Sequence, residues 1–261
     1  MEIVGIHLVQ TLAHVGTPRR SVVARVDAQG RVLAMDGVAD DAEVVEAVGY
    51  GPRIVVVDAP LAVPNDTGSR DIERVLAWCD IPLFPASRRR MTALHGGLRA
   101  QALFPALDAR GAEGAWEASP DQVLRQLIWE REHPAGAAAL ELADYRAMWP
   151  GVRAPVYRPK AAGRARAAGL APAWQIVASA LDTGGWAPAT DGDDWGVIAD
   201  AARLDALCCA LAGLRALGVG GDAVRLGSPE RGRMVVPADA NLRGRIELTL
   251  TRMRAEGAIR I

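Results

Sequence analysis

The stretch RIVVVDAPLAVPND, residues 53–66, decides the fold class of this sequence. Its run of β-branched apolar residues is typical of a central strand buried on both faces of a sheet. Asp58 follows the run at once, and Ala59-Pro60 then ends the strand. A carboxylate at the carboxyl end of such a strand points into the crevice where α/β proteins bind ligands. The alternative is that Asp58 accepts backbone hydrogen bonds within the turn.

The segments around this strand predict an α/β protein with a mixed five-stranded sheet and helices on both faces. Three antiparallel strands come first, and the turn at 27–30 joins the second to the third. A helix at 39–49, closed by Gly49, leads into the strand at 53–59. A fifth strand is predicted at 137–143, a long apolar helix at 195–218, two short strand-like pieces at 222–227 and 232–237, and a charged helix at 240–256.

The chain is predicted to form one domain over residues 1–261, with a helical insertion at about 80–135. Helical patterns occur at 70–79, 97–110 and 120–132. An insertion of this size is expected to cap or shape a site rather than merely connect strands.

Composition limits the classes of function. Half of the residues are hydrophobic, so a sizeable core is available, and no apolar run is long enough for a membrane span. We therefore expect a cytoplasmic protein without a membrane partner; the sequence makes no prediction of its oligomeric state. The net charge of -1 argues against general electrostatic attraction to nucleic acid, so only local basic clusters count. The three cysteines lack the spacing of a zinc site or disulfide framework and are expected in the core.

Two further carboxylates, Asp205 and Glu141, lie in predicted apolar segments rather than in polar surface segments. Asp205 lies on a helix face made of alanines and cysteines, so it either pairs with a buried base or binds a metal. Glu141 alternates with leucines in its predicted strand, where an ordinary solvent-facing position is the alternative reading. Asp200, with Arg203 one turn away, is expected to be a solvated surface residue.

Acids on separate elements can together form a divalent-metal site. Hard oxygen ligands suit Mg²⁺ or Mn²⁺, and paired ions stabilise the attacking and leaving oxygens of phosphoryl transfer. The β-β-β-α-β-α order, with acids on strand one, strand four and a late helix, is the ribonuclease H-like arrangement. It points to phosphodiester hydrolysis.

The sequence also resembles a family, the one labelled domain of unknown function 429, whose members are predicted nucleases with a ribonuclease H-like fold. The resemblance runs along most of the chain and lies in the shared order of VVVDAPLAVP, RDIERVLAWCDIPLFP, ALELADYRAMWP, RLDALCCALAGLRA and ERGRMVVP. It implies that Asp58, Glu141 and Asp205 are catalytic and metal-binding residues.

The first strand departs from the family pattern. Family members usually carry an aspartate after Gly-Ile, whereas this chain reads Gly5-Ile6-His7. His7 is either a substitute ligand, which suits Mn²⁺ better than Mg²⁺, a mark of a lost metal site, or a hydrogen-bonded core residue.

Basic residues supply candidate substrate contacts. Arg70 begins a helix directly after the Asp58 loop, where it can bind an anion or form a surface ion pair with Glu73. The resemblance places a basic segment after Glu141, which here holds Arg158, Lys160 and Arg164. The run Arg88-Arg89-Arg90 is read as a solvated loop, with phosphate contact as the alternative.

The sequence thus predicts a metal-dependent nuclease or other phosphodiester hydrolase with an altered metal site. The alternative is a catalytically inactive protein that binds nucleic acid or a protein partner through the same cleft. A nucleotide-binding kinase or ATPase of related topology is disfavoured, because it needs a second similar domain and glycine-rich phosphate loops.

Overall fold

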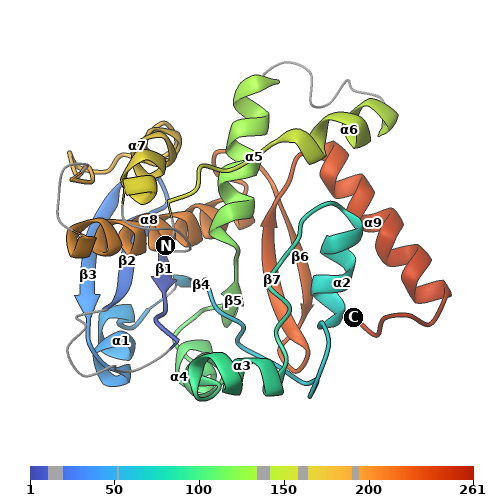
Figure 1. Cartoon of the computed structure of the whole chain (residues 1–261). Helices are drawn as coiled ribbons and strands as arrows, with labels where there is room; N and C mark the ends of the chain where they lie inside the picture. Colours follow the sequence, from blue (N-terminus) through green and yellow to red (C-terminus); the bar gives the residue numbers. More distant parts are fainter. Residues whose placement is uncertain (11–19, 52, 134–141, 158–163, 190–193) are drawn as a thin grey trace.

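The computed structural model describes residues 1–10, 20–51, 53–133, 142–157, 164–189 and 194–261 (Figure 1). Its strands are β1 (Glu2–His7), β2 (Ser21–Asp27), β3 (Val32–Val38), β4 (Arg53–Val57), β5 (Ala115–Glu117), β6 (Ala223–Ser228) and β7 (Gly232–Pro237). Its helices are α1 (Asp41–Val48), α2 (Asp71–Trp78), α3 (Arg88–His95), α4 (Arg99–Asp108), α5 (Pro120–Glu132), α6 (Leu142–Met148), α7 (Arg164–Ala178), α8 (Asp194–Ala216) and α9 (Ala240–Ala255), with the 3₁₀ turn η1 (Trp149–Gly151).

Within the described residues the strands form one mixed sheet in the order β3-β2-β1-β4-β5-β7-β6. The first three strands are antiparallel neighbours, and β4 lies parallel to β1. The α/β class is therefore confirmed, but the prediction of five strands is wrong. The sheet has seven strands because the hairpin of β6 and β7 extends its edge by pairing with β5.

The strand beside β4 differs from the predicted one. It is β5, three residues long, and it lies inside the segment 80–135 that we expected to be a helical insertion. The strand expected at 137–143 is wrong at its end, because Leu142 and Ala143 begin α6; residues 137–141 lie outside the described residues. Alanine, leucine and glutamate are all strong helix formers, so alternation in so short a segment is weak evidence for a strand.

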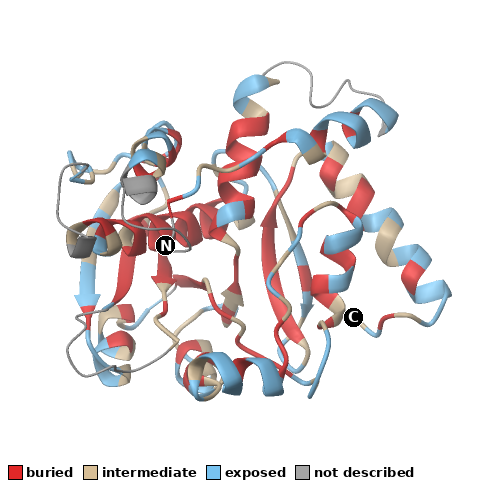
Figure 2. Cartoon of the chain, in the orientation of Figure 1, coloured by how far each residue is buried: buried red, intermediate tan, exposed pale blue. Residues whose placement is uncertain are grey.

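Two cores lie on the two faces of the sheet, because side chains alternate along each strand. On one face, Ile3 and Ile54 belong to a large core with α5, α7 and α8. On the other face, Val4 and Val55 pack with α1 and α4. Figure 2 shows α8 buried along most of its length where it crosses the strands.

Gly5 allows α8 to lie unusually close to β1. A Cβ atom at this position would stand 2.0 Å from the carbonyl oxygen of Ala206 and 2.4 Å from the backbone nitrogen of Ala210. Any residue other than glycine would therefore push the helix away from the strand. This close contact determines how near side chains on α8 come to the end of β1.

The other predicted elements match the structure closely. The turn at 27–30, the helices at 39–49, 70–79, 97–110, 120–132, 195–218 and 240–256, and the two late strands are confirmed with small shifts at their ends. The arginines read as a loop instead begin α3, since Ser87 caps that helix by accepting a hydrogen bond from the Arg90 N–H. The three cysteines are buried, as expected. Along the described residues, the helices are too short or too polar to cross a bilayer.

Candidate functional site

His7 and Asp58 meet at the carboxyl ends of two neighbouring parallel strands. In β1, His7 has the same parity as Ile3 and Gly5, and Asp58 continues the parity of Ile54 in β4, so both side chains point to the α8 face. The His7 Nδ1 atom lies 2.6 Å from Asp58 Oδ2. The backbone N–H of Leu8 donates to the other Asp58 oxygen at 2.9 Å. Asp58 therefore forms these hydrogen bonds with residues at the end of β1. The alternative prediction was that its hydrogen bonds stay within its own turn.

Asp205 approaches this pair from α8. Its side chain is buried, and its Oδ2 atom lies 3.5 Å from His7 Nδ1. The hydroxyl of Tyr157 donates to Asp205 Oδ1 at 2.5 Å. A buried base was expected as the partner of this carboxylate. The structure shows two partners, His7 and Tyr157.

His7, Asp58 and Asp205 form what we call the histidine–carboxylate cluster. One ligand atom from each residue lies within 4.8 Å of the others, so a single cation can contact all three. Two carboxylates and one imidazole are suitable ligands for Mn²⁺ or Zn²⁺ and less suitable for Mg²⁺. When Asp58 is ionised, His7 Nδ1–H is the donor of this short contact and Asp58 Oδ2 the acceptor, and a cation bound at Nδ1 takes the place of that hydrogen.

A cleft of about 560 Å³ opens beside the cluster. Asp58 and Tyr157 belong to its lining, together with Arg70, Glu73 and Glu117. Its remaining walls are mainly apolar. They are formed by residues 59–60, 82–84, 118, 120 and 155–156, Met91 and Met234, with the polar residues Gln10, His95, Ser119 and Asp121. The size falls within the range of small-ligand pockets, and it leaves room for a small ligand next to the cluster.

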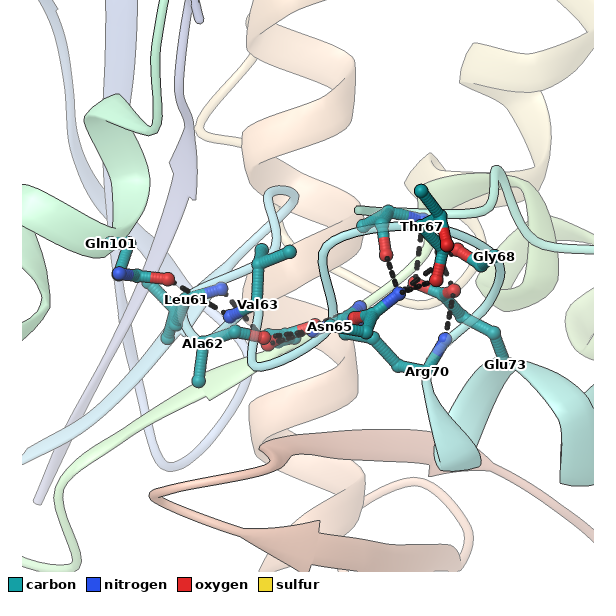
Figure 3. A network of polar contacts seen from close by, with 11 residues as sticks. Leu61, Ala62, Val63, Asn65, Thr67, Gly68, Arg70, Glu73 and Gln101 are labelled. Atoms are coloured by element: carbon teal, nitrogen blue, oxygen red, sulfur yellow. Dashed lines mark hydrogen bonds and ion pairs between the residues drawn. The ribbon is translucent and has the colours of Figure 1, made fainter. Parts of the chain in front are cut away.

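The loop after β4, residues 58–70, is held from several sides. The N–H of Val63 donates to Gln101 of α4 at 3.0 Å, and the N–H of Leu61 donates to Glu117 at 2.9 Å. Figure 3 shows Asn65 turned toward Thr67 and Gly68, whose carbonyl oxygens accept from its amide at 3.1 and 3.0 Å. These bonds give Asp58 a stable support.

Arg70 is the central residue of a buried ion-pair triad with Glu73 and Glu117. Its Nε atom donates to Glu73 at 2.7 Å, and its two terminal nitrogens donate to the two oxygens of Glu117 at 2.8 Å each. Burial disfavours the charged guanidinium, but the two carboxylates outweigh burial and raise the pKa of Arg70 well above its usual range.

The surface ion pair proposed for Arg70 is therefore wrong, although its partner Glu73 was predicted. All three side chains are nearly inaccessible to water. Another N–H of the guanidinium donates to the Ala62 carbonyl, which leaves Arg70 little capacity to bind a substrate anion. Its structural role is to connect β5, α2 and the loop that follows Asp58.

Glu141, Arg158 and Lys160 lie outside the described residues, and Arg164 begins α7. Asp200 is buried rather than solvated, because it accepts from the Ala189 N–H as well as from Arg203.

Two residues of the site region, Glu117 and Tyr157, were not predicted from the sequence. Glu117 stands at the end of β5, just before the Ser119-Pro120 helix start, and an acid in that position was the available signal. Tyr157 follows no local pattern that would have identified it. Its partner, Asp205, lies 48 residues further along the chain.

We expect Asn65→Ala to lower the free energy of unfolding by about 1 kcal/mol, because three carbonyl oxygens, including that of Ala86, lose a hydrogen-bond donor. Asn65→Asp should cost more, since it turns a carboxylate toward the same carbonyl oxygens. Urea unfolding of the two variants measures both effects. Equal stability of the native protein and both variants would show that Asn65 does not hold the loop.

Comparison with known proteins adds no relative: no family model, no curated protein and no solved structure matches this chain.

Proposed function

We propose that this protein is a divalent-metal-dependent phosphodiester hydrolase, a nuclease, whose metal ion is held by the histidine–carboxylate cluster. The observation that carries the proposal is the convergence of His7, Asp58 and Asp205 from three separate elements beside a cleft. Acids that converge with a histidine beside a cleft meet the geometric criteria for a candidate functional site.

The arrangement of the sheet supports a ribonuclease H-like assignment for the fold. Three antiparallel strands, a helix and a strand parallel to the first occur in the expected order. The cluster occupies the end of the first strand, the end of the fourth strand and a late helix. We propose that the additional edge strands β6 and β7 are an extension of this fold.

The ligands favour one ion, and Mn²⁺ over Mg²⁺. A carboxylate has two oxygens and can bridge two ions, whereas each imidazole nitrogen offers one lone pair to one ion. His7 stands where a bridging aspartate is usual, so two ions at this position are disfavoured. When bound, the ion supplies Lewis-acid polarisation of a phosphate oxygen and a water of lowered pKa.

The protein's own residues orient the cluster. The Leu8 N–H holds one Asp58 oxygen, and the Tyr157 hydroxyl holds one Asp205 oxygen. In each carboxylate the second oxygen is the one nearest to His7. Such fixed outer contacts reduce the reorganisation that binding requires.

We expect Mn²⁺ to bind the metal-free protein, with one ligand atom each from His7, Asp58 and Asp205. Asp58→Asn and Asp205→Asn should each abolish the binding heat. Calorimetric titration of the native protein and of each variant measures the affinity. Mg²⁺ should bind more weakly than Mn²⁺.

Asp66→Asn is the matched control, because Asp66 lies on the same loop as Asp58 with an 85% exposed side chain. It should bind Mn²⁺ as the native protein does. Cleavage of labelled oligonucleotides with Mn²⁺ then tests the reaction. If Mn²⁺ does not bind the native protein, the metal site and the proposed activity both fail.

The short His7–Asp58 contact favours the second candidate function, an inactive binding protein. A histidine that only closes the cluster as a hydrogen-bond partner leaves the cleft as a binding surface. Salt-dependent binding of nucleic acid without Mn²⁺ binding or cleavage would favour this function over the hydrolase.

A further inference from the structure

The lining of the cleft beside the cluster combines two chemical kinds of residue. One kind is polar and includes Asp58, whose side chain is 8% exposed. The other kind is apolar and forms a rim that water reaches, with Phe84 49% exposed and Val156 68% exposed. Large apolar groups at the mouth of a cleft are poorly explained by core packing, and they mark a contact with a ligand.

Phe84 is accompanied by positive charge. The guanidinium carbon of Arg90 stands 4.2 Å from the centre of the Phe84 ring. Arg90 continues the run Arg88-Arg89-Arg90, whose side chains are exposed at the start of α3. An exposed aromatic ring next to a row of arginines is the combination by which proteins hold a base and its phosphates.

We propose that the cleft binds single-stranded nucleic acid, with an unpaired base stacked on Phe84 and the adjoining phosphates along the arginines of α3. This inference rests on the proposed function and specifies its substrate class. A base in a duplex is stacked on its neighbours and offers no free face to Phe84. An apolar peptide would use the rim but not the arginines, so the charge favours a polyanion.

The test is fluorescence anisotropy with one labelled oligonucleotide of mixed sequence, free and annealed to its complement. Measurements in EDTA remove metal binding and cleavage from the result. The native protein should bind the single strand more tightly than the duplex. Phe84→Ala should weaken single-strand binding by about tenfold, and Phe84→Tyr should restore it.

Tyr50→Ala is the matched control, because Tyr50 is another exposed aromatic residue with an arginine, Arg110, 3.7 Å from its ring centre. Tyr50 is not part of the cleft lining, so its replacement should leave binding unchanged. Because Phe84 is half exposed, its replacement should leave the fold intact, and a thermal melt of each variant before the binding measurement checks this.

The inference is overturned if Phe84→Ala and native protein bind the single strand equally, or if the duplex binds more tightly than the single strand. Its failure is distinguishable from that of the proposed function. If Phe84→Ala binds the single strand as the native protein does while Mn²⁺ still binds, only the stacking site is rejected. If Phe84→Ala weakens binding but Mn²⁺ does not bind, only the hydrolase proposal is rejected.

Discussion

Arg70→Leu is expected to lower the free energy of unfolding by about 3–5 kcal/mol. The substitution leaves Glu73 and Glu117 buried without the guanidinium that pairs with both of them. Removing one member of a buried ion pair is costly because the remaining charge stays dehydrated and uncompensated. Since Glu117 also accepts from the Leu61 N–H, the loop that carries Asp58 should loosen as well.

The loss in Arg70→Leu should depend on pH. Burial already raises the pKa of Glu73 in the native protein, and without Arg70 this pKa rises further. Protonation of such a carboxyl removes its buried negative charge. The folded variant is therefore more stable at a pH below the raised pKa than at neutral pH. The deficit should therefore shrink in acid and grow as pH rises through the raised pKa.

Urea unfolding at several pH values measures this prediction, with Arg74→Leu as the control. Arg74 lies on the same helix and pairs with Asp71 at 3.5 Å, but its side chain is 43% exposed. Its replacement should cost at most about 1 kcal/mol. If Arg70→Leu and Arg74→Leu lower the free energy of unfolding equally, the buried triad does not stabilise the fold more than a surface ion pair does.

Gly5→Ala is expected to lower stability by roughly 1–3 kcal/mol and to weaken Mn²⁺ binding strongly. The new methyl group would meet backbone atoms of Ala206 and Ala210 rather than a movable side chain. Helix α8 must then shift away from β1, and Asp205 moves with it from His7. Stability and metal affinity should fall together, which unfolding and calorimetry of one preparation can measure.

Gly244→Ala is the matched control for this substitution. Gly244 lies inside α9, and a Cβ atom there would meet nothing within 4 Å. Alanine should stabilise that helix by up to about 1 kcal/mol and leave Mn²⁺ binding unchanged. Native stability and affinity in Gly5→Ala would contradict the close approach of α8 to β1.

The elements that were predicted correctly are those with local causes. The helix α1 is delimited by Asp40, which caps it, and by Gly49, whose φ of 70° suits glycine. The strand β4 follows from five consecutive residues that are all buried. The strand β5 was missed because three residues carry almost no periodic signal, and its pairing with β4 joins distant parts of the chain.

The α/β class, most helices and strands, and the unusual positions of Asp58 and Asp205 could all be predicted from the sequence, because they follow from residues close to one another in the chain. The partners of the site residues, in contrast, are known only from the folded structure. His7 meets Asp58 across 51 residues, Tyr157 meets Asp205 across 48, and Arg70 meets Glu117 across 47. Such pairs depend on the order of the strands in the sheet and on how closely α8 packs against Gly5. The spacing of residues along the chain predicts neither of these.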